Sequence, residues 1–89
     1  GLANLNDLTA TESGINLFPN PANQNFTIQS DKGIITEVKI YSATGQLVKL
    51  VSDLSANQVN IENLNLKEGL YLCSVKINGQ SHTKRIIIE

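Results

Sequence analysis

Cys73 and His82 are the two residues whose side chains most often do nucleophilic or metal chemistry. A cysteine beside a histidine can act as a nucleophile, because the imidazole takes the thiol proton. Cys73, however, lies in the middle of an alternating apolar run, and His82 lies in a different predicted strand. We therefore expect Cys73 to be a packed, unreactive thiol and His82 to lie on a solvated strand face.

Neither a metal centre nor an acid-base pair is predicted elsewhere. A zinc site takes three or four protein ligands, and this sequence has one histidine, one cysteine and scattered carboxylates. No two acids are spaced as partners in acid and base roles. The glycines follow polar turns and precede strands, whereas a phosphate-binding loop opens a helix. We expect a protein that is not an enzyme and that has no catalytic residue, metal ligand or cofactor.

The composition limits the class of protein further. The chain has 89 residues, enough for one small domain, with a formal net charge of −1 and 17% charged residues. This balance provides no basic surface for nucleic acid. The single cysteine cannot form an internal disulfide. Neither an apolar run of about 18 residues nor a secretory leader is apparent, so we expect a cytosolic protein or a piece of a longer chain.

The first segment favours a piece of a longer chain. Residues 1–14 are rich in Asn, Thr, Ser and Gly, and their sizeable apolar residues are three leucines at every third position. This spacing would allow a short helical turn, but the segment has no sustained period and is typical of a flexible linker. A linker at this end implies a passenger upstream of it.

Two prolines flank Asn20 just before the chain becomes apolar. Proline has no N–H group for a ladder and disfavours helix at the preceding residue. Phe26 and Ile28 then alternate with polar residues, which predicts a half-buried strand. We expect that strand to begin after Pro21, with the prolines protecting its edge.

Two hairpins are predicted downstream. Residues 34–41 alternate as a strand that joins residues 47–51 through a turn in which Gly45 supplies a positive φ. The expected inward face of the first strand consists of Ile34, Thr36, Val38 and Ile40.

The second hairpin has the clearer signal. Asn78-Gly79 lies between two extended runs, and this dipeptide is typical of a two-residue type I′ turn. We expect it to join residues 70–77 to residues 80–88. A shorter strand is expected around residues 59–61.

Leu66, Gly69 and Tyr71 have the spacing of a tyrosine corner, in which the tyrosine hydroxyl bonds back to the preceding crossover. Because no stretch of ten or more residues has a helical stripe, we predict an all-β fold. The predicted architecture is a small immunoglobulin-like antiparallel β-sandwich of about seven strands with a Greek-key crossover. Its expected core consists of Phe26, Ile28, Val38, Ile40, Tyr71, Cys73, Val75, Ile77, Leu47 or Val48, and two of the C-terminal isoleucines.

The last residues combine a basic pair, three isoleucines and Glu89 in the order HTKRIIIE. A short β-branched run is ordinarily a buried or edge strand. A strand in this position could also be recognised by a receptor that adds a strand to it.

The sequence from residue 17 to residue 89 resembles the type A C-terminal sorting domain of cargo proteins that use the type IX secretion system of Bacteroidetes. Four motifs in this order carry the resemblance: the Pro19-Asn20-Pro21 entrance, the Tyr41-x-x-x-Gly45-Gln46-Leu47-Val48 hairpin, the Leu66-x-x-Gly69-x-Tyr71 corner and the basic-then-aliphatic residues 84–88. Family members commonly end in a basic residue, where this sequence has Glu89.

The resemblance implies a non-enzymatic secretion signal. Residues 1–16 would link an N-terminal passenger to a sorting domain formed by residues 17–89. The translocon and shuttle components of the type IX system would recognise the domain, and a sortase-like cysteine protease would cut in the linker. The cargo would pass from the periplasm to the outer membrane, cell surface or medium. The implied recognition residues are Lys84, Arg85, Ile86, Ile87, Ile88 and Glu89.

One alternative from a different class stays open. The domain could be an accessory β-sandwich of a secreted enzyme, either a spacer or a glycan-binding module with exposed aromatic residues. Exposed edge strands would in addition allow a weak homodimer.

Overall fold

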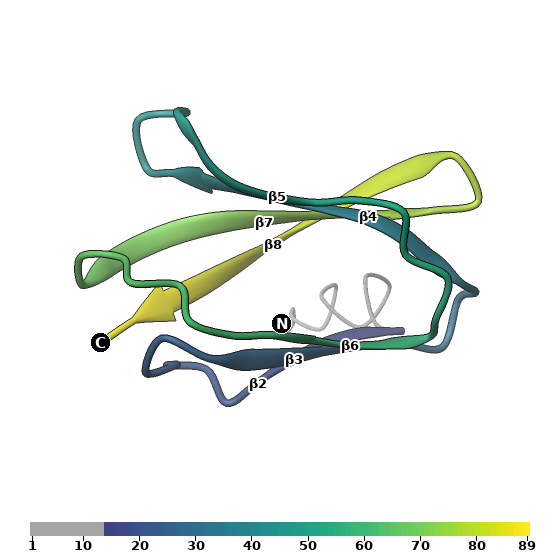
Figure 1. The fold of residues 1–89 in the computed structure, drawn as a ribbon, viewed down its shortest axis with the longest axis horizontal. Coiled ribbons are helices and arrows are strands. Elements are labelled where there is room, and N and C mark those ends of the chain that lie inside the picture. The colour runs from purple at the N-terminus through teal and green to yellow at the C-terminus, as the bar shows by residue number, and fades with distance from the viewer. Residues whose placement is uncertain (1–13) are drawn as a thin grey trace, which may run out of the picture.

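The computed structural model describes residues 14–89, which form seven β-strands and no helix (Figure 1). The strands are β2 (Ile15–Phe18), β3 (Phe26–Ser30), β4 (Ile35–Ser42), β5 (Leu47–Val51), β6 (Gln58–Ile61), β7 (Gly69–Ile77) and β8 (Gln80–Ile88). All strand pairs are antiparallel, in one sheet of order β2-β3-β6 and another of order β5-β4-β7-β8. The all-β prediction is therefore confirmed. Within the described residues, no helix has the length and apolar character needed to cross a membrane.

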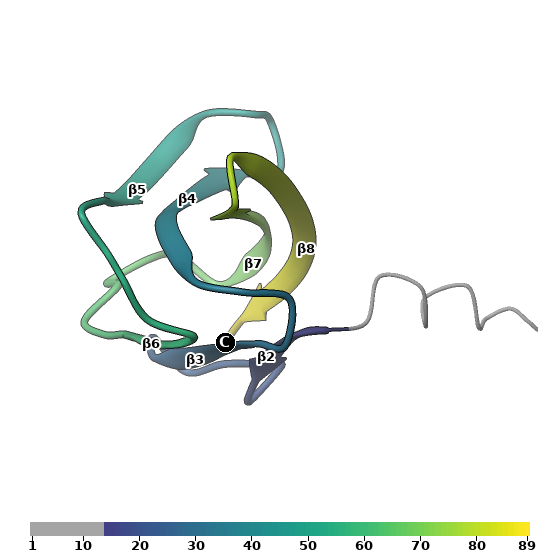
Figure 2. The same cartoon turned by 90° about the vertical axis from the view of Figure 1, so that its right-hand side faces the viewer.

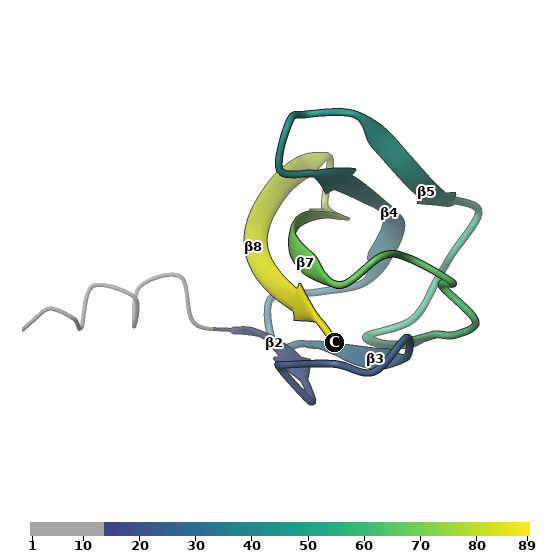
Figure 3. The same ribbon diagram turned by 90° about the vertical axis from the view of Figure 1, so that its left-hand side faces the viewer.

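The two sheets face each other as a sandwich. Figures 2 and 3 show the four-stranded sheet curving over the flatter three-stranded sheet. The core between them is largely aliphatic, because each strand directs alternate side chains inward. The buried apolar residues are Ile15, Ala22, Phe26, Ile28, Ile35, Val38, Ile40, Val59, Ile61, Leu64, Tyr71, Cys73, Val75, Ile77, Ile86 and Ile88.

Most of the expected core residues are buried. Of the two alternatives Leu47 and Val48, Val48 packs against the core and Leu47 is 46% exposed. Of the three C-terminal isoleucines, Ile86 and Ile88 are buried and Ile87 is exposed. Each fully buried isoleucine contributes about 1.5–3 kcal/mol relative to an exposed one.

Both predicted hairpins are present. Asn78 and Gly79 have φ of 53° and 80°, and Ile77 pairs with Gln80 across the turn between β7 and β8. Two successive positive φ values are those of a type I′ turn. In the turn between β4 and β5, Gly45 has a φ of 93°.

The chain passes from one sheet to the other between β6 and β7, where the tyrosine corner was predicted. The Tyr71 hydroxyl donates a hydrogen bond to the carbonyl oxygen of Lys67 at 2.6 Å. This contact confirms the bond back to the crossover that the spacing of Leu66, Gly69 and Tyr71 predicted. The immunoglobulin-like topology and the Greek-key crossover stay predictions.

The residues predicted to face inward from β4 are wrong for the first half of the strand. Ile34 is 45% exposed and precedes the strand, whereas Ile35 is completely buried. The pairing with β7 shifts its register between Ile35 and Glu37, so that Thr36 is an extra residue. A bulge of this kind breaks the two-residue period that the sequence prediction assumed. Val38 and Ile40 are buried as expected.

The predicted edge position of β3 is also wrong. β3 is the central strand of its sheet, because β2 pairs on one side and β6 on the other. β2 was not predicted as a strand, and Ile15 and Asn16, which were expected in the linker, pair with Ser30 and Gln29. The prolines instead lie in the loop between β2 and β3.

Candidate functional site

The cysteine and histidine do not form a reactive pair. Cys73 and His82 lie on neighbouring strands, but Cys73 is completely buried. Burial raises the pKa of the Cys73 thiol to about 12, since a thiolate would be desolvated there. The thiol is therefore protonated at neutral pH and is a poor nucleophile. In residues 14–89, no three His, Cys, Asp or Glu side chains gather as metal ligands.

The four sequence motifs meet at one end of the sandwich, at the left of Figure 1. The register explains this arrangement, because Gly69 of the corner pairs with Ile88. Ser42, which precedes the Gly45 turn, pairs with Tyr71. Ala22, directly after Pro21, forms a parallel bridge with Ile88. This end of the molecule is our candidate functional site.

The loop between β2 and β3 holds the end of β8, and we call residues 19–25 the clamp loop. The Nδ2 group of Asn20 donates to the carbonyl oxygen of Arg85 at 3.1 Å, and the Ile87 amide donates to Asn20 Oδ1 at 3.0 Å. The Ala22 amide then donates to the Ile87 carbonyl at 2.7 Å, and the Glu89 amide donates to the Ala22 carbonyl at 2.8 Å.

The residue types of the clamp loop explain why the side chain of Asn20, and not its backbone, bonds to β8. Pro19 and Pro21 have no N–H group, so the backbone beside Asn20 cannot continue a ladder along β8. The primary amide of Asn20 offers one donor and one acceptor, as a peptide group does. Asn20 therefore occupies the place of a neighbouring strand, and Ala22 restores backbone pairing. Together they cover the outer edge of β8 at residues 85–89.

A second amide of the clamp loop holds the crossover between β6 and β7. Gln24 Nε2 donates to the Leu66 carbonyl at 2.7 Å, and the Leu66 amide donates to Gln24 Oε1 at 2.7 Å. The Leu64 amide also donates to the Gln24 carbonyl at 3.1 Å. Leu66, singled out for its spacing from Tyr71, is thus tied to the clamp loop by its backbone.

Ala22 and Gln24 were not among the predicted site residues. Their roles depend on residues more than 40 positions away, such as Leu66, which lies 42 positions from Gln24. The one local signal is the run of three amide residues after Ala22, in NPANQN.

The six predicted recognition residues lie on two faces at the end of β8, one turned toward the core and one exposed. Ile86 and Ile88 are completely or almost completely buried, whereas Arg85, Ile87 and Glu89 are exposed. Lys84 is half-buried. The exposed Ile87 pairs across the sheet with Leu70, which is 39% exposed. A partner at this outer face would therefore meet a guanidinium group beside two aliphatic side chains.

An open hollow of about 530 Å³ lies where the corner and the end of β8 meet. It is lined by Glu68, Gly69, Ile87, Ile88 and Glu89. A Cβ atom added at Gly69 would meet no heavy atom within 4 Å, so the hollow is open above that residue. Its two side-chain carboxylates and the exposed Ile87 suit a partner that is both basic and apolar.

The described chain begins at the opposite end of the sandwich. Ile15 pairs with Ser30 at the far end of β3, and the Asp31 amide donates to the Gly14 carbonyl at 2.6 Å. A polypeptide attached before Gly14 would therefore start away from the clamp loop and the end of β8.

The chain matches a known protein family. The model of the family described as "Secretion system C-terminal sorting domain" matches residues 16–89, which include the clamp loop, the corner and the end of β8. Among curated proteins, none matches the chain.

Proposed function

The chain belongs to the family of C-terminal sorting domains of the type IX secretion system, and on that premise we propose that it carries an attached cargo protein through the outer-membrane translocon. Membership of this family implies a secreted or surface-located protein and an interaction with the type IX machinery. In our proposal the sorting domain, without catalytic activity, consists of residues 17–89 together with Ile15 and Asn16 of β2, and the residues before β2 link it to a passenger.

The outward-facing residues at the end of β8 are our proposed recognition surface. Arg85, Ile87 and Glu89 are exposed, and the hollow beside Gly69 adjoins them. Ile86 and Ile88 contribute by holding the segment in the core. Lys84, which directly precedes Arg85, is half-buried and adds positive charge. The translocon and the shuttle would thus contact one face of a rigid strand.

The single observation that carries this proposal is the coverage of the β8 edge by Asn20 and Ala22. Four hydrogen bonds fix the last residues of the sandwich in one conformation, which lowers the entropy lost when a receptor binds them. Pro19-Asn20-Pro21 and residues 84–88 then act together, although they lie at opposite ends of the domain sequence.

We further propose that a sortase-like cysteine protease cuts the linker after export. Residues 1–13 lie outside the described residues, so the support comes from Gly14, where the described chain starts away from the recognition surface. A protease and a receptor could then act at opposite ends of the domain. We also propose a weak homodimer that forms through the edge of β5, where Leu47 and Leu50 are 46% and 50% exposed.

The testing experiment uses a fluorescent protein directed to the periplasm and fused before residues 1–89 in a type IX-competent bacterium. Deleting residues 84–89 would also remove two buried isoleucines, so it cannot separate recognition from folding. We would instead combine Arg85→Ser with Ile87→Thr, since both side chains face outward. The matched control is Ser81→Ala with Thr83→Ala, exposed positions on the same face of β8.

We expect the unchanged fusion and the control to leave the cell and the Arg85/Ile87 variant to stay in the periplasm, with the same melting temperature for each purified domain. Periplasmic retention of the unchanged fusion would refute the sorting function. Export of the Arg85/Ile87 variant at the unchanged rate would refute the recognition surface alone.

A further inference from the structure

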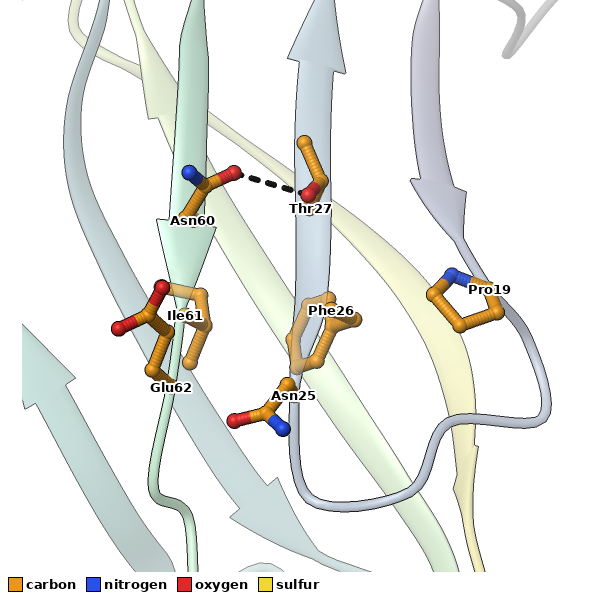
Figure 4. Close-up of a pocket in the computed structure, with 7 residues that line it drawn as sticks. All are labelled: Pro19, Asn25, Phe26, Thr27, Asn60, Ile61 and Glu62. Atoms are coloured by element: carbon orange, nitrogen blue, oxygen red, sulfur yellow. Dashed lines mark hydrogen bonds between the residues drawn. The ribbon is translucent and has the colours of Figure 1, made fainter.

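The outer face of the three-stranded sheet carries a pocket that does not belong to the proposed recognition surface. It has a volume of about 250 Å³ and spans the end of β2, the start of β3 and the end of β6 (Figure 4). Its exposed rim consists of Pro19, Asn25, Asn60 and Glu62, with Thr27 half-buried among them. Neighbouring strands are about 4.8 Å apart, so a pocket across three strands has the width of a sugar ring with its hydroxyl groups.

Two amides in the pocket are held in fixed orientations. Thr27 Oγ1 donates to Asn60 Oδ1 at 2.8 Å, which directs the Asn60 Nδ2 group away from Thr27 (Figure 4). The Asn63 amide donates to Asn25 Oδ1 at 2.9 Å, so that the Asn25 Nδ2 group remains to donate. The pocket thus offers two amide donors that need little reorganisation on binding.

The acceptor is the Glu62 carboxylate, which follows Ile61 at the end of β6, on the Asn60 side of the pocket (Figure 4). Amide donors and a carboxylate acceptor that line one pocket match a pair of neighbouring hydroxyl groups, since each hydroxyl both donates and accepts. The negative charge of Glu62 disfavours a phosphate, a sulfate or an acidic sugar.

The opposite side of the pocket is apolar. The Pro19 ring borders it, and Phe18, which pairs with Thr27 and is 44% exposed, precedes Pro19 without lining the pocket itself. Flat apolar side chains beside convergent polar groups form the usual lining of a small-molecule site. The C–H face of a sugar ring can pack against such side chains while its hydroxyl groups bond to the amides.

A peptide strand fits this surface less well. β3 is paired on both sides, by β2 and by β6, so its backbone groups are already used in the sheet. Strand addition requires a free edge. We therefore propose that this pocket binds a neutral sugar through adjacent hydroxyl groups, with Asn25 and Asn60 donating and Glu62 accepting. This binding function goes beyond sorting, although Pro19 and Asn25 also belong to the clamp loop.

The test is an NMR titration of the 15N-labelled chain of residues 1–89. The probes are the methyl glycosides of glucose, galactose, mannose and N-acetylglucosamine, each raised to about 50 mM to detect the weak binding expected of a single sugar ring. Glucuronate and galacturonate serve as acidic counterparts. We expect at least one neutral glycoside to shift the side-chain amide signals of Asn25 and Asn60 in a saturable way.

Three variants define the site. Asn60→Ala should weaken binding about tenfold, because it removes a donor to a sugar hydroxyl. Glu62→Gln should reduce the preference for neutral over acidic sugars. Gln46→Ala, an exposed amide in the turn between β4 and β5, is the control and should bind as the unchanged chain does.

The proposal is overturned if no neutral glycoside gives a saturable shift, or if Asn60→Ala and Gln46→Ala bind equally well. Tighter binding of the acidic sugars would overturn the assigned ligand class. Shifts of the same signals by an extended peptide, with none by any sugar, would assign the pocket to a peptide instead.

Discussion

Tyr71 combines a packing role and a hydrogen-bonding role in one side chain. The residue is 8% exposed in the core, and its hydroxyl donates to the Lys67 carbonyl four residues earlier in the chain. The bond fixes the path of the crossover just before β7 begins. Cys73, two residues further on, has a packing role only, because burial keeps its thiol protonated.

Replacing Tyr71 by Phe should lower the free energy of unfolding by about 1 kcal/mol, since the ring remains and one hydrogen bond is lost. Urea unfolding followed by circular dichroism measures the change. Tyr41→Phe is the matched control, because the half-buried Tyr41 lies on the outer face of β4. Equal losses in both variants would contradict the role of the corner bond.

The Cys73 thiol predicts a pH dependence of stability. Its pKa is raised from 9.0 to about 12 in the folded state. Above pH 9 the unfolded chain loses this proton while the folded chain keeps it, so the free energy of unfolding falls as pH rises from 9 to 12. The limiting slope for one proton is about 1.4 kcal/mol per pH unit.

Comparison with Cys73→Ala isolates this effect, because the variant keeps every other titrating group. The difference in unfolding free energy between the two proteins should be constant below pH 8 and shrink above pH 9. A difference that stays constant up to pH 11 would show that the thiol ionises equally in both states.

At the scale of elements, the clamp loop connects parts of the fold that no single hairpin connects. The amide side chains of Asn20 and Gln24 bond to the backbone of β8 and of the crossover before β7, respectively. Three of the family motifs are thereby linked: the prolines, the corner and the end of β8. The Gly45 turn adjoins them through the pairing of Ser42 with Tyr71.

Asn20→Ala should free the end of β8 without unfolding the sandwich. The loss of two exposed hydrogen bonds is expected to lower stability by about 1 kcal/mol and to speed hydrogen exchange of the Ile87 amide. Hydrogen exchange of the Val75 amide, in the middle of β7, should become faster only by the amount that the lower global stability accounts for.

Two further variants test the donor and acceptor roles separately. Asn20→Asp keeps an acceptor for the Ile87 amide but brings a carboxylate close to the Arg85 carbonyl, so we expect part of the loss. Asn16→Ala, an exposed asparagine of β2, should leave Ile87 exchange unchanged. Unchanged exchange in Asn20→Ala would refute the clamp.

At the scale of the molecule, the last residues of β8 belong both to the core and to the surface. Ile88 is 1% exposed and closes the sandwich beside Ala22, whereas Ile87 is 40% exposed. A domain of this size has only a few kcal/mol of stability. A substitution in this segment can therefore abolish secretion in two separate ways. At a buried position it causes misfolding, and at an exposed position it removes a contact with the receptor.

Ile88→Ala should cost about 2–5 kcal/mol and leave much of the domain unfolded, because it opens a cavity between the sheets. Ile87→Ala should cost well under 1 kcal/mol, as expected for a surface position. Thermal unfolding of the two purified variants measures the contrast. Equal melting temperatures would contradict the assignment of Ile88 to the core and Ile87 to the surface.

The sequence by itself determined the features that depend on near neighbours. Alternation identified β3 and β7, Asn78-Gly79 identified the hairpin turn that joins β7 to β8, and the spacing of Leu66, Gly69 and Tyr71 identified the corner. These features follow from backbone geometry and from side chains a few residues apart. The same local reasoning missed the bulge at Thr36, because an extra residue leaves no mark in the apolar pattern.

Only the tertiary structure decided which strands have neighbours and which loops cover an edge. β3 proved central because β2 and β6 lie beside it, and Asn20 proved to be a partner of Arg85, 65 residues away. The pocket rim likewise joins Asn25 to Asn60 and Glu62 across a sheet. Hydrogen bonds between distant residues depend on how the whole chain packs, and the type of a residue does not specify its distant partner.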